Sequence, residues 1–177
     1  MLHMRDPIVA HFKGDGITGP CILQVEDNAQ EVILQQKAFE RVGIHNVIQV
    51  VTDGQHAIDY LAGKGSFSDR QEYPLPCLVL LKLKLQRQHG IEVLEWIRAQ
   101  PGLRTLVVIA MCQWEQTTEL ERAYQLGANS CAIEPTDLDG WLDMARALKS
   151  WWLAHNRFAP VHRSEPHFAD VHISADG

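Results

Sequence analysis

Three ionisable side chains follow two short apolar runs, and their types define the chemistry open to this chain. Glu26 and Asp27 come directly after residues 21–25, and Lys82 comes directly after residues 78–81. Neighbouring carboxylates can bind a divalent cation, and a lysine among carboxylates can form a salt bridge or attack a carbonyl compound. The pattern indicates a charged site if the two runs end at the same place in the fold.

Both runs are typical of buried strands in a parallel sheet, because they are apolar without alternation and have strand length. The carboxyl ends of such strands form the edge where open α/β sheets bind ligands. Asn28 and Glu31 predict a capping box at the start of the following helix. Further along the chain, strands and helices alternate. We expect strands near residues 21–25, 47–51, 77–81, 106–110 and 131–133, and helices near 28–42, 54–61, 91–99, 115–126 and 138–155. Five βα units in sequence predict an α/β fold with a doubly wound, five-stranded parallel sheet.

Three segments resemble the receiver domain of two-component response regulators. They are residues 22–28 (ILQVEDN), 78–90 and 126–135 (LGANSCAIEP), which match the first, third and last strands of that family in order and spacing. The resemblance implies a flavodoxin/CheY-like sheet of strand order 2-1-3-4-5. The long polar connection at residues 63–76 is similar to that of stand-alone receivers associated with bacterial phytochrome-type histidine kinases.

The resemblance divides the chain into three parts. We expect an N-terminal extension at residues 1–19, a receiver-like domain at residues 20–156 with an extended last helix, and a C-terminal tail at residues 157–177.

Four positions depart from the receiver pattern. The resemblance implies a phosphorylatable aspartate at position 82, a threonine or serine at 111, an aromatic residue at 131 and a lysine at 134. The chain has Lys82, Met111, Cys131 and Glu134 at these positions. Of the phosphorylation machinery, only the acidic pair is retained.

Lys82 cannot replace an acceptor aspartate. The aspartate is a carboxylate nucleophile that forms an acyl phosphate, while Mg²⁺ neutralises the developing charge. A lysine offers neither that nucleophile nor an oxygen ligand, and its ammonium competes with Mg²⁺ for the same carboxylates. We therefore expect no aspartyl phosphorylation at position 82, no catalytic residue and no cofactor, with Mg²⁺ binding weak or lost.

Two interpretations of Lys82 remain open. In the first, its ammonium forms a permanent internal salt bridge with Asp27 or Glu134. Such a pair at ~4 Å and an effective dielectric constant of ~20 gains about 4 kcal/mol before desolvation is subtracted. In the second, the lysine extends into solvent from a decayed pocket, and its aliphatic stem lies over apolar surface.

Three classes of function are compatible with these residues. We favour a pseudo-receiver that binds a histidine kinase, another signalling protein or a second copy of itself. The alternatives are a receiver gated by a small ligand or by pH at Glu26, Asp27, Lys82 and Glu134, and an enzyme with a Schiff-base lysine. We do not expect an enzyme, because carboxylates raise the pKa of a neighbouring lysine whereas a Schiff-base lysine needs a lowered pKa.

Composition excludes several other classes. The chain has 177 residues and a net charge of −6, without a dense cluster of Lys and Arg, which argues against nucleic-acid binding. No segment has the ~20 apolar residues of a membrane span, and residues 1–19 lack a secretory signal, so we expect a cytoplasmic protein. The cysteines have no C-x-x-C pairing, and histidines 155, 162, 167 and 172 match no compact zinc pattern, so no metal site is expected.

The last helix is expected to be apolar on two faces. One stripe should face the sheet: Leu138, Trp141, Leu142, Ala145, Leu148 and Trp152. A second stripe lies beside it: Met144, Ala147, Trp151 and Ala154. A second apolar face usually has a second partner, and the phytochrome-associated receivers use such an extension in homodimers. We expect a homodimer with Met144, Trp151 and Phe158 in its interface; the alternative is that this stripe closes over its own domain.

Overall fold

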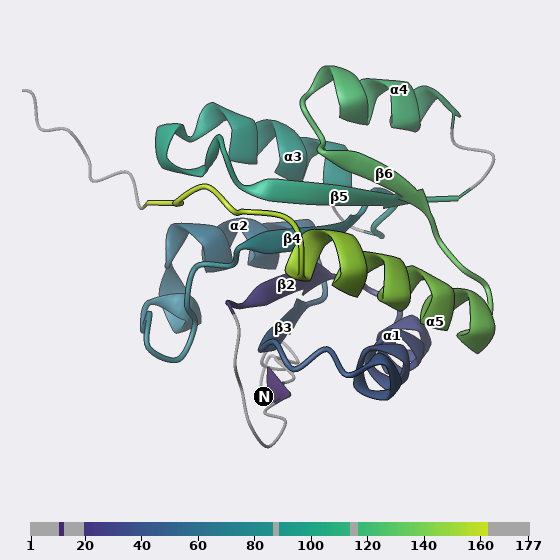
Figure 1. Cartoon of the computed structure of the whole chain (residues 1–177). Coiled ribbons are helices and arrows are strands. Elements are labelled where there is room, and N and C mark those ends of the chain that lie inside the picture. The colour runs from purple at the N-terminus through teal and green to yellow at the C-terminus, as the bar shows by residue number, and fades with distance from the viewer. Residues whose placement is uncertain (1–10, 13–19, 87–88, 114–116, 163–177) are drawn as a thin grey trace, which may run out of the picture.

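The computed structural model describes residues 11–12, 20–86, 89–113 and 117–162. They form a sheet of six strands in the order β1-β3-β2-β4-β5-β6, with helices on both faces (Figure 1). The strands are β1 (His11–Phe12), β2 (Ile22–Val25), β3 (Ile48–Val51), β4 (Leu78–Lys82), β5 (Val107–Cys112) and β6 (Ser130–Ile133). The helices are α1 (Ala29–Val42), α2 (Gly54–Ala62), α3 (Gly90–Ala99), α4 (Thr117–Gln125) and α5 (Leu138–Ala147). Shorter helical segments are η1 (Gly65–Phe67), η2 (Pro101–Leu103) and η3 (Leu148–Leu153).

The five strands from β2 to β6 are parallel and confirm the predicted order 2-1-3-4-5. All residues of β2, β4 and β5 are buried, as expected for apolar runs that are covered on both faces. In register, Val25 pairs with both Val51 and Leu81, and Lys82 pairs with Met111. The ends of β2 and β4 therefore lie side by side at the carboxyl edge of the sheet.

Strand β1 lies within the segment predicted to be an N-terminal extension. It pairs antiparallel with β3, with His11 opposite Gln49 and Phe12 opposite Ile48. Without it, β3 would be the edge of the sheet and would present unpaired backbone groups. The sheet thus has one antiparallel edge strand in addition to the five predicted parallel strands.

Two apolar clusters stabilise the two faces of the sheet. Leu23, Val79 and Leu81 point toward α2, α3 and α4, whereas Ile22 and Leu80 point toward α1 and α5. This division follows from the alternation of side chains along a strand. Burial of each large aliphatic side chain contributes about 1.5–3 kcal/mol, so both helical layers are held firmly against the strands that carry the site.

The long connection after α2 is anchored by an arginine and an aromatic cluster. Arg70 donates hydrogen bonds to the carbonyl oxygens of Tyr60, Leu61 and Tyr73. The Phe67 ring lies 5.4 Å from the Tyr60 ring and 5.2 Å from the Tyr73 ring, measured between centroids. These contacts give a defined conformation to a segment that is long for its position.

The last predicted helix changes its hydrogen-bond pattern near its end. Its α-helical part stops at Ala147 and continues as the π-helical segment η3. The stripe predicted to face the sheet does so, because Trp141, Ala145 and Leu148 are buried in the cluster beneath α1 and α5. The chain then returns along the sheet, where the His162 backbone N–H donates to the Gly102 carbonyl oxygen.

The residues predicted to form a dimer interface divide between two environments. Met144 and Phe158 are partly buried and pack against the cluster of α1 and α5, whereas Trp151 is 63% exposed. Only Trp151 of the three is therefore a large exposed apolar side chain. The homodimer stays a prediction. Residues 163–177, with two of the four C-terminal histidines, and residues 115–116 of the predicted fourth helix lie outside the described residues.

Candidate functional site

Lys82 ends β4 and is 8% exposed, so its side chain does not extend into solvent. Its Nζ donates a hydrogen bond of 2.7 Å to Glu26 Oε1, and Glu26 is itself buried. Glu26 follows β2, the strand that pairs with β4. Because Val25 and Leu81 are register partners, the next residues on the two strands have neighbouring positions and meet at the carboxyl edge.

Three more carboxylates surround the ammonium. Lys82 Nζ lies 3.6 Å from Asp27 Oδ1, 3.8 Å from Glu31 Oε1 and 4.0 Å from Glu134 Oε1. The structure thus corrects the predicted pairing in one respect: Asp27 and Glu134 are near, but Glu26 is the hydrogen-bonded partner. We use the name carboxylate cluster for Glu26, Asp27, Glu31 and Glu134.

Glu31 was not among the predicted site residues, because its spacing from Asn28 suggested a capping box. Asn28 does cap α1, since its side chain accepts from the Gln30 backbone N–H. The Asn28 N–H, which Glu31 would bind in a capping box, donates instead to Glu26 Oε1. Glu31 is therefore available to the cluster. Its position could have indicated this role, because Glu31 lies in the first turn of the helix that begins directly after the acidic pair.

Asp27 has a second role in the site. Its Oδ2 accepts a hydrogen bond of 2.9 Å from the backbone N–H of Gln86, in the loop between β4 and α3. The helix after this loop must begin with Gly90, because a Cβ atom there would collide with the carbonyl oxygen of Lys82. Asp27 thus connects the segment after β2 to the loop that follows Lys82.

The two remaining positions that depart from the receiver pattern lie on β5 and β6. Met111 is buried in the cluster of α1 and α5, and Cys131 packs partly buried on the opposite face of the sheet. The Cys131 backbone N–H donates to the hydroxyl oxygen of Tyr124 on α4. Tyr124 is 50% exposed and was not predicted. It brings an aromatic ring next to the strand position where the family resemblance implies one.

The four cysteines are free, and their thiols are held protonated. Burial raises the pKa of Cys21 to about 11 and that of Cys77 to about 12. The thiolate is the reactive form of cysteine, so these side chains behave as small apolar groups.

Burial and charge act against each other within the cluster. Burial raises the pKa of Glu26 to about 7, although its hydrogen bond to Lys82 opposes that shift. Burial also raises the pKa of Glu134. For Lys82, burial lowers the pKa, but the hydrogen bond to Glu26 and the surrounding carboxylates outweigh it, so the net shift is upward. Lys82 is therefore a stable ammonium, and its protonation is the opposite of what Schiff-base chemistry needs.

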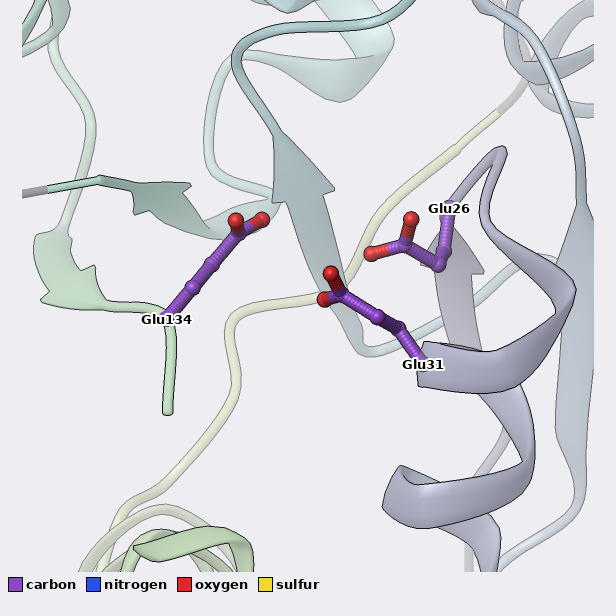
Figure 2. Close-up of side chains that lie close together, drawn as sticks. All are labelled: Glu26, Glu31 and Glu134. Atoms are coloured by element: carbon purple, nitrogen blue, oxygen red, sulfur yellow. The ribbon is translucent and has the colours of Figure 1, made fainter. Parts of the chain in front are cut away.

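Three of the carboxylates have the arrangement of metal ligands. Among the residues that the structure describes, one group of possible ligands comes together, with oxygens of Glu26, Glu31 and Glu134 within 4.8 Å of one another. Figure 2 shows these side chains pointing toward one another from the end of β2, the start of α1 and the end of β6. Asp27 is not a member of this group.

A doubly wound parallel sheet with an acidic pair at its carboxyl edge defines the class of receiver-like α/β proteins. The family model of the response regulator receiver domain matches residues 22–146. The chain belongs to the response regulator receiver family.

Individual relatives agree with this assignment. The probable methanogenesis regulatory protein FilR2 of Methanothrix harundinacea is 35% identical over 136 residues, which are 77% of this chain and 85% of the relative. Response regulator Rcp1 of Synechocystis is 27% identical over 132 residues, 75% of this chain and 88% of the relative. The solved structure of RPA3017, a response regulator in red light signalling of R. palustris, superposes with a TM-score of 0.76 at 29% identity, covering 81% of this chain and all of that one.

The predicted membership of the receiver family is thus confirmed, and the chain is a receiver of two-component signalling. None of the helices in the described part of the chain combines the length and apolar character that a membrane span requires.

Proposed function

We propose that this receiver transmits signals by protein contact, without phosphorylation of position 82. The observation that carries the proposal is the buried hydrogen bond between Lys82 Nζ and Glu26 Oε1. In the family pattern, position 82 holds the acceptor aspartate, and a lysine has no carboxylate from which to form an acyl phosphate. An internal cation in this place supplies a permanent charge where a receiver would gain and lose a phosphoryl group.

Loss of the Mg²⁺ that supports phosphorylation is part of the same proposal. The Lys82 ammonium lies within 4.0 Å of both members of the acidic pair, so it neutralises charge that Mg²⁺ would otherwise neutralise. Asp27 also accepts a hydrogen bond from the Gln86 N–H. We propose that no catalytic cofactor is needed and that the protein is not an enzyme, because the raised pKa of Lys82 disfavours a neutral amine.

Two types of protein partner are proposed for this receiver. We propose that the chain forms a homodimer through the end of its last helix, where Trp151 is 63% exposed. A histidine kinase or another signalling protein is the second proposed type of partner, since receivers function by binding such proteins. Both contacts would be independent of a phosphorylation event.

Phosphorylation tests the proposal directly. The full chain is incubated with acetyl phosphate and Mg²⁺ and then measured by intact mass spectrometry; we expect no adduct of about 80 Da. The matched control is the double variant Lys82→Asp with Glu134→Lys, which restores the charges of the family pattern and should gain the adduct. A stable adduct on the wild-type chain would overturn the proposal.

A second candidate function is a receiver gated by a small ligand or by pH at the carboxylate cluster. It is favoured by the excess of carboxylates, since Asp27, Glu31 and Glu134 lie within 4.0 Å of an ammonium that already has Glu26 as its hydrogen-bonded partner. Amide exchange of the loop residues 83–86, compared across pH and added ions, tests it. Exchange rates in this loop that do not change with pH or added ions would rule out this second candidate.

A further inference from the structure

We infer that ordered water is buried between the sheet and helices α1 and α5, where it bridges the side-chain amide of Gln24 on β2 and the indole N–H of Trp141 on α5. This water site lies in the same layer as the carboxylate cluster but deeper in the core. The inference goes beyond the proposed function, because it concerns the interior of the fold and does not depend on the state of position 82.

Gln24 is a polar side chain in the interior of a central strand. It is 1% exposed, and β2 pairs with both β3 and β4, so the side chain cannot reach solvent at an edge of the sheet. Neither Gln24 Oε1 nor Gln24 Nε2 has a hydrogen-bond partner within the part of the chain that the structure describes. Roughly nine in ten buried polar groups in native proteins are bonded to protein or to ordered water, because an unpaired buried amide is costly. A ligand that both donates and accepts hydrogen bonds is therefore expected at this amide.

The Gln24 amide enters the layer that lies under α1 and α5. Gln24 pairs in register with Val50 on one side and Leu80 on the other, and both belong to the apolar cluster of α1 and α5. Ile22, two residues earlier on β2, belongs to the same cluster. Residues in register, and residues two apart on one strand, point to the same face of a sheet. The Gln24 side chain therefore lies among these apolar residues.

Trp141 brings a second unpaired polar atom into this layer. Its side chain is 0% exposed and packs in the cluster of α1 and α5, and none of the described residues accepts a hydrogen bond from its Nε1. An indole N–H is only a donor, and it usually has a partner when it is buried. Water can accept from the indole N–H and donate to Gln24 Oε1, so a bridging water satisfies groups on both α5 and β2.

Polar side chains continue from this site to the carboxylate cluster. Gln35 is 3% exposed and lies one turn after Glu31 on the same face of α1. Lys82 follows Leu80 by two residues on β4, so it points into the same layer as Leu80. A buried water typically makes about three hydrogen bonds to polar groups, and this layer brings such groups together from the strand and both helices. The water therefore gives α5 a polar link to the strand that leads into Glu26.

Nuclear magnetic resonance of the full chain tests this site directly. In the wild-type chain we expect a cross-peak between bound water and the indole N–H proton of Trp141, after sequential assignment of the five tryptophan indole signals. Gln24→Met replaces the amide by an apolar side chain of similar length, and the cross-peak should be lost in that variant. Gln125→Met is the matched control, because Gln125 is exposed at the end of α4 and its replacement should leave the cross-peak unchanged.

The sign of the stability change gives a second test. Without the Gln24 amide the bridging water is lost and the indole N–H has no partner, so Gln24→Met should lower the melting temperature by about 2–4 °C or more, while Gln125→Met should not change it. An amide that is buried without water would give the opposite sign, because an apolar side chain would then replace a costly unpaired group. The inference is overturned if the wild-type chain shows no water cross-peak at the Trp141 indole, or if Gln24→Met raises the melting temperature.

Discussion

Lys82 Nζ and Glu26 Oε1 are joined by a hydrogen bond of 2.7 Å between the ends of two adjacent parallel strands, 56 residues apart in the sequence. Both side chains are buried. The pair forms the centre of the site, and the other carboxylates take their places around it.

Removal of one partner should leave the other as an unpaired buried charge. Lys82→Met is expected to lower the free energy of unfolding by roughly 3–5 kcal/mol. Glu26→Gln should cost less, because its neutral amide can still accept the hydrogen bond. The double variant should lose less than the sum of the single losses, with a coupling of about 1 kcal/mol or more. Urea unfolding of the wild-type chain, the two single variants and the double variant measures this coupling. Strictly additive losses would show that Lys82 and Glu26 do not stabilise each other.

Stability should fall as the pH rises through neutrality. The pKa of Glu26 is about 7 in the folded chain against an ordinary value of 4.5, and that of Glu134 is also raised. Between pH 4.5 and about pH 7 Glu26 binds more protons in the folded chain than in the unfolded chain, so the free energy of unfolding decreases as the pH rises. The raised pKa of Lys82 contributes only at alkaline pH.

This pH effect can be assigned with one variant. We expect the free energy of unfolding to decrease by on the order of 1–3 kcal/mol between about pH 5 and about pH 8, measured by urea unfolding in the presence of a chelator. Glu26→Gln removes the titrating group and should flatten the profile. An equally steep profile in that variant would show that other groups cause the slope.

Asp27 should control the loop after Lys82. Asp27→Ala removes the acceptor of the Gln86 N–H. We expect faster hydrogen exchange of that amide and a free energy of unfolding lowered by about 1–2 kcal/mol. Asp27→Asn keeps an acceptor oxygen and should stay close to the wild-type exchange rate. Identical exchange in all three proteins would mean that the loop is held by other contacts.

Trp151 should govern self-association. Trp151→Ser should convert a dimer into a monomer and halve the mass measured by light scattering at high micromolar concentration. Ile33→Ser is the matched control, since Ile33 is also a large apolar residue, 49% exposed, but lies on α1. A wild-type chain that is already monomeric would refute the proposed homodimer.

The sheet was predictable because its signal is local. Apolar runs such as residues 78–81 cannot form anything but a buried strand or a buried helical segment, and the capping residue Asn28 and the stop at Gly43 limit the helix between strands. The antiparallel strand β1 was not predictable, since its two residues have no periodic pattern and are defined only by pairing with β3.

Part of the site was also predictable, because a residue at the end of a parallel strand or directly after it must lie at the carboxyl edge. Glu26, Asp27 and Lys82 satisfy this rule, and the family pattern added Met111, Cys131 and Glu134. Glu31 and Tyr124 were missed because they lie on helices. The sequence places them on a helix face but does not say which neighbour that face meets.

By itself, the sequence determined the receiver fold and the presence of a lysine at position 82, where the family resemblance implies an aspartate, because both depend on residue types and on short-range order along the chain. Only the tertiary structure decided the partner of Lys82, which is Glu26. It alone also decided that Glu31 joins the cluster instead of capping α1. Those outcomes depend on distances and burial between segments far apart in the sequence, where small differences in side-chain position choose one carboxylate over another.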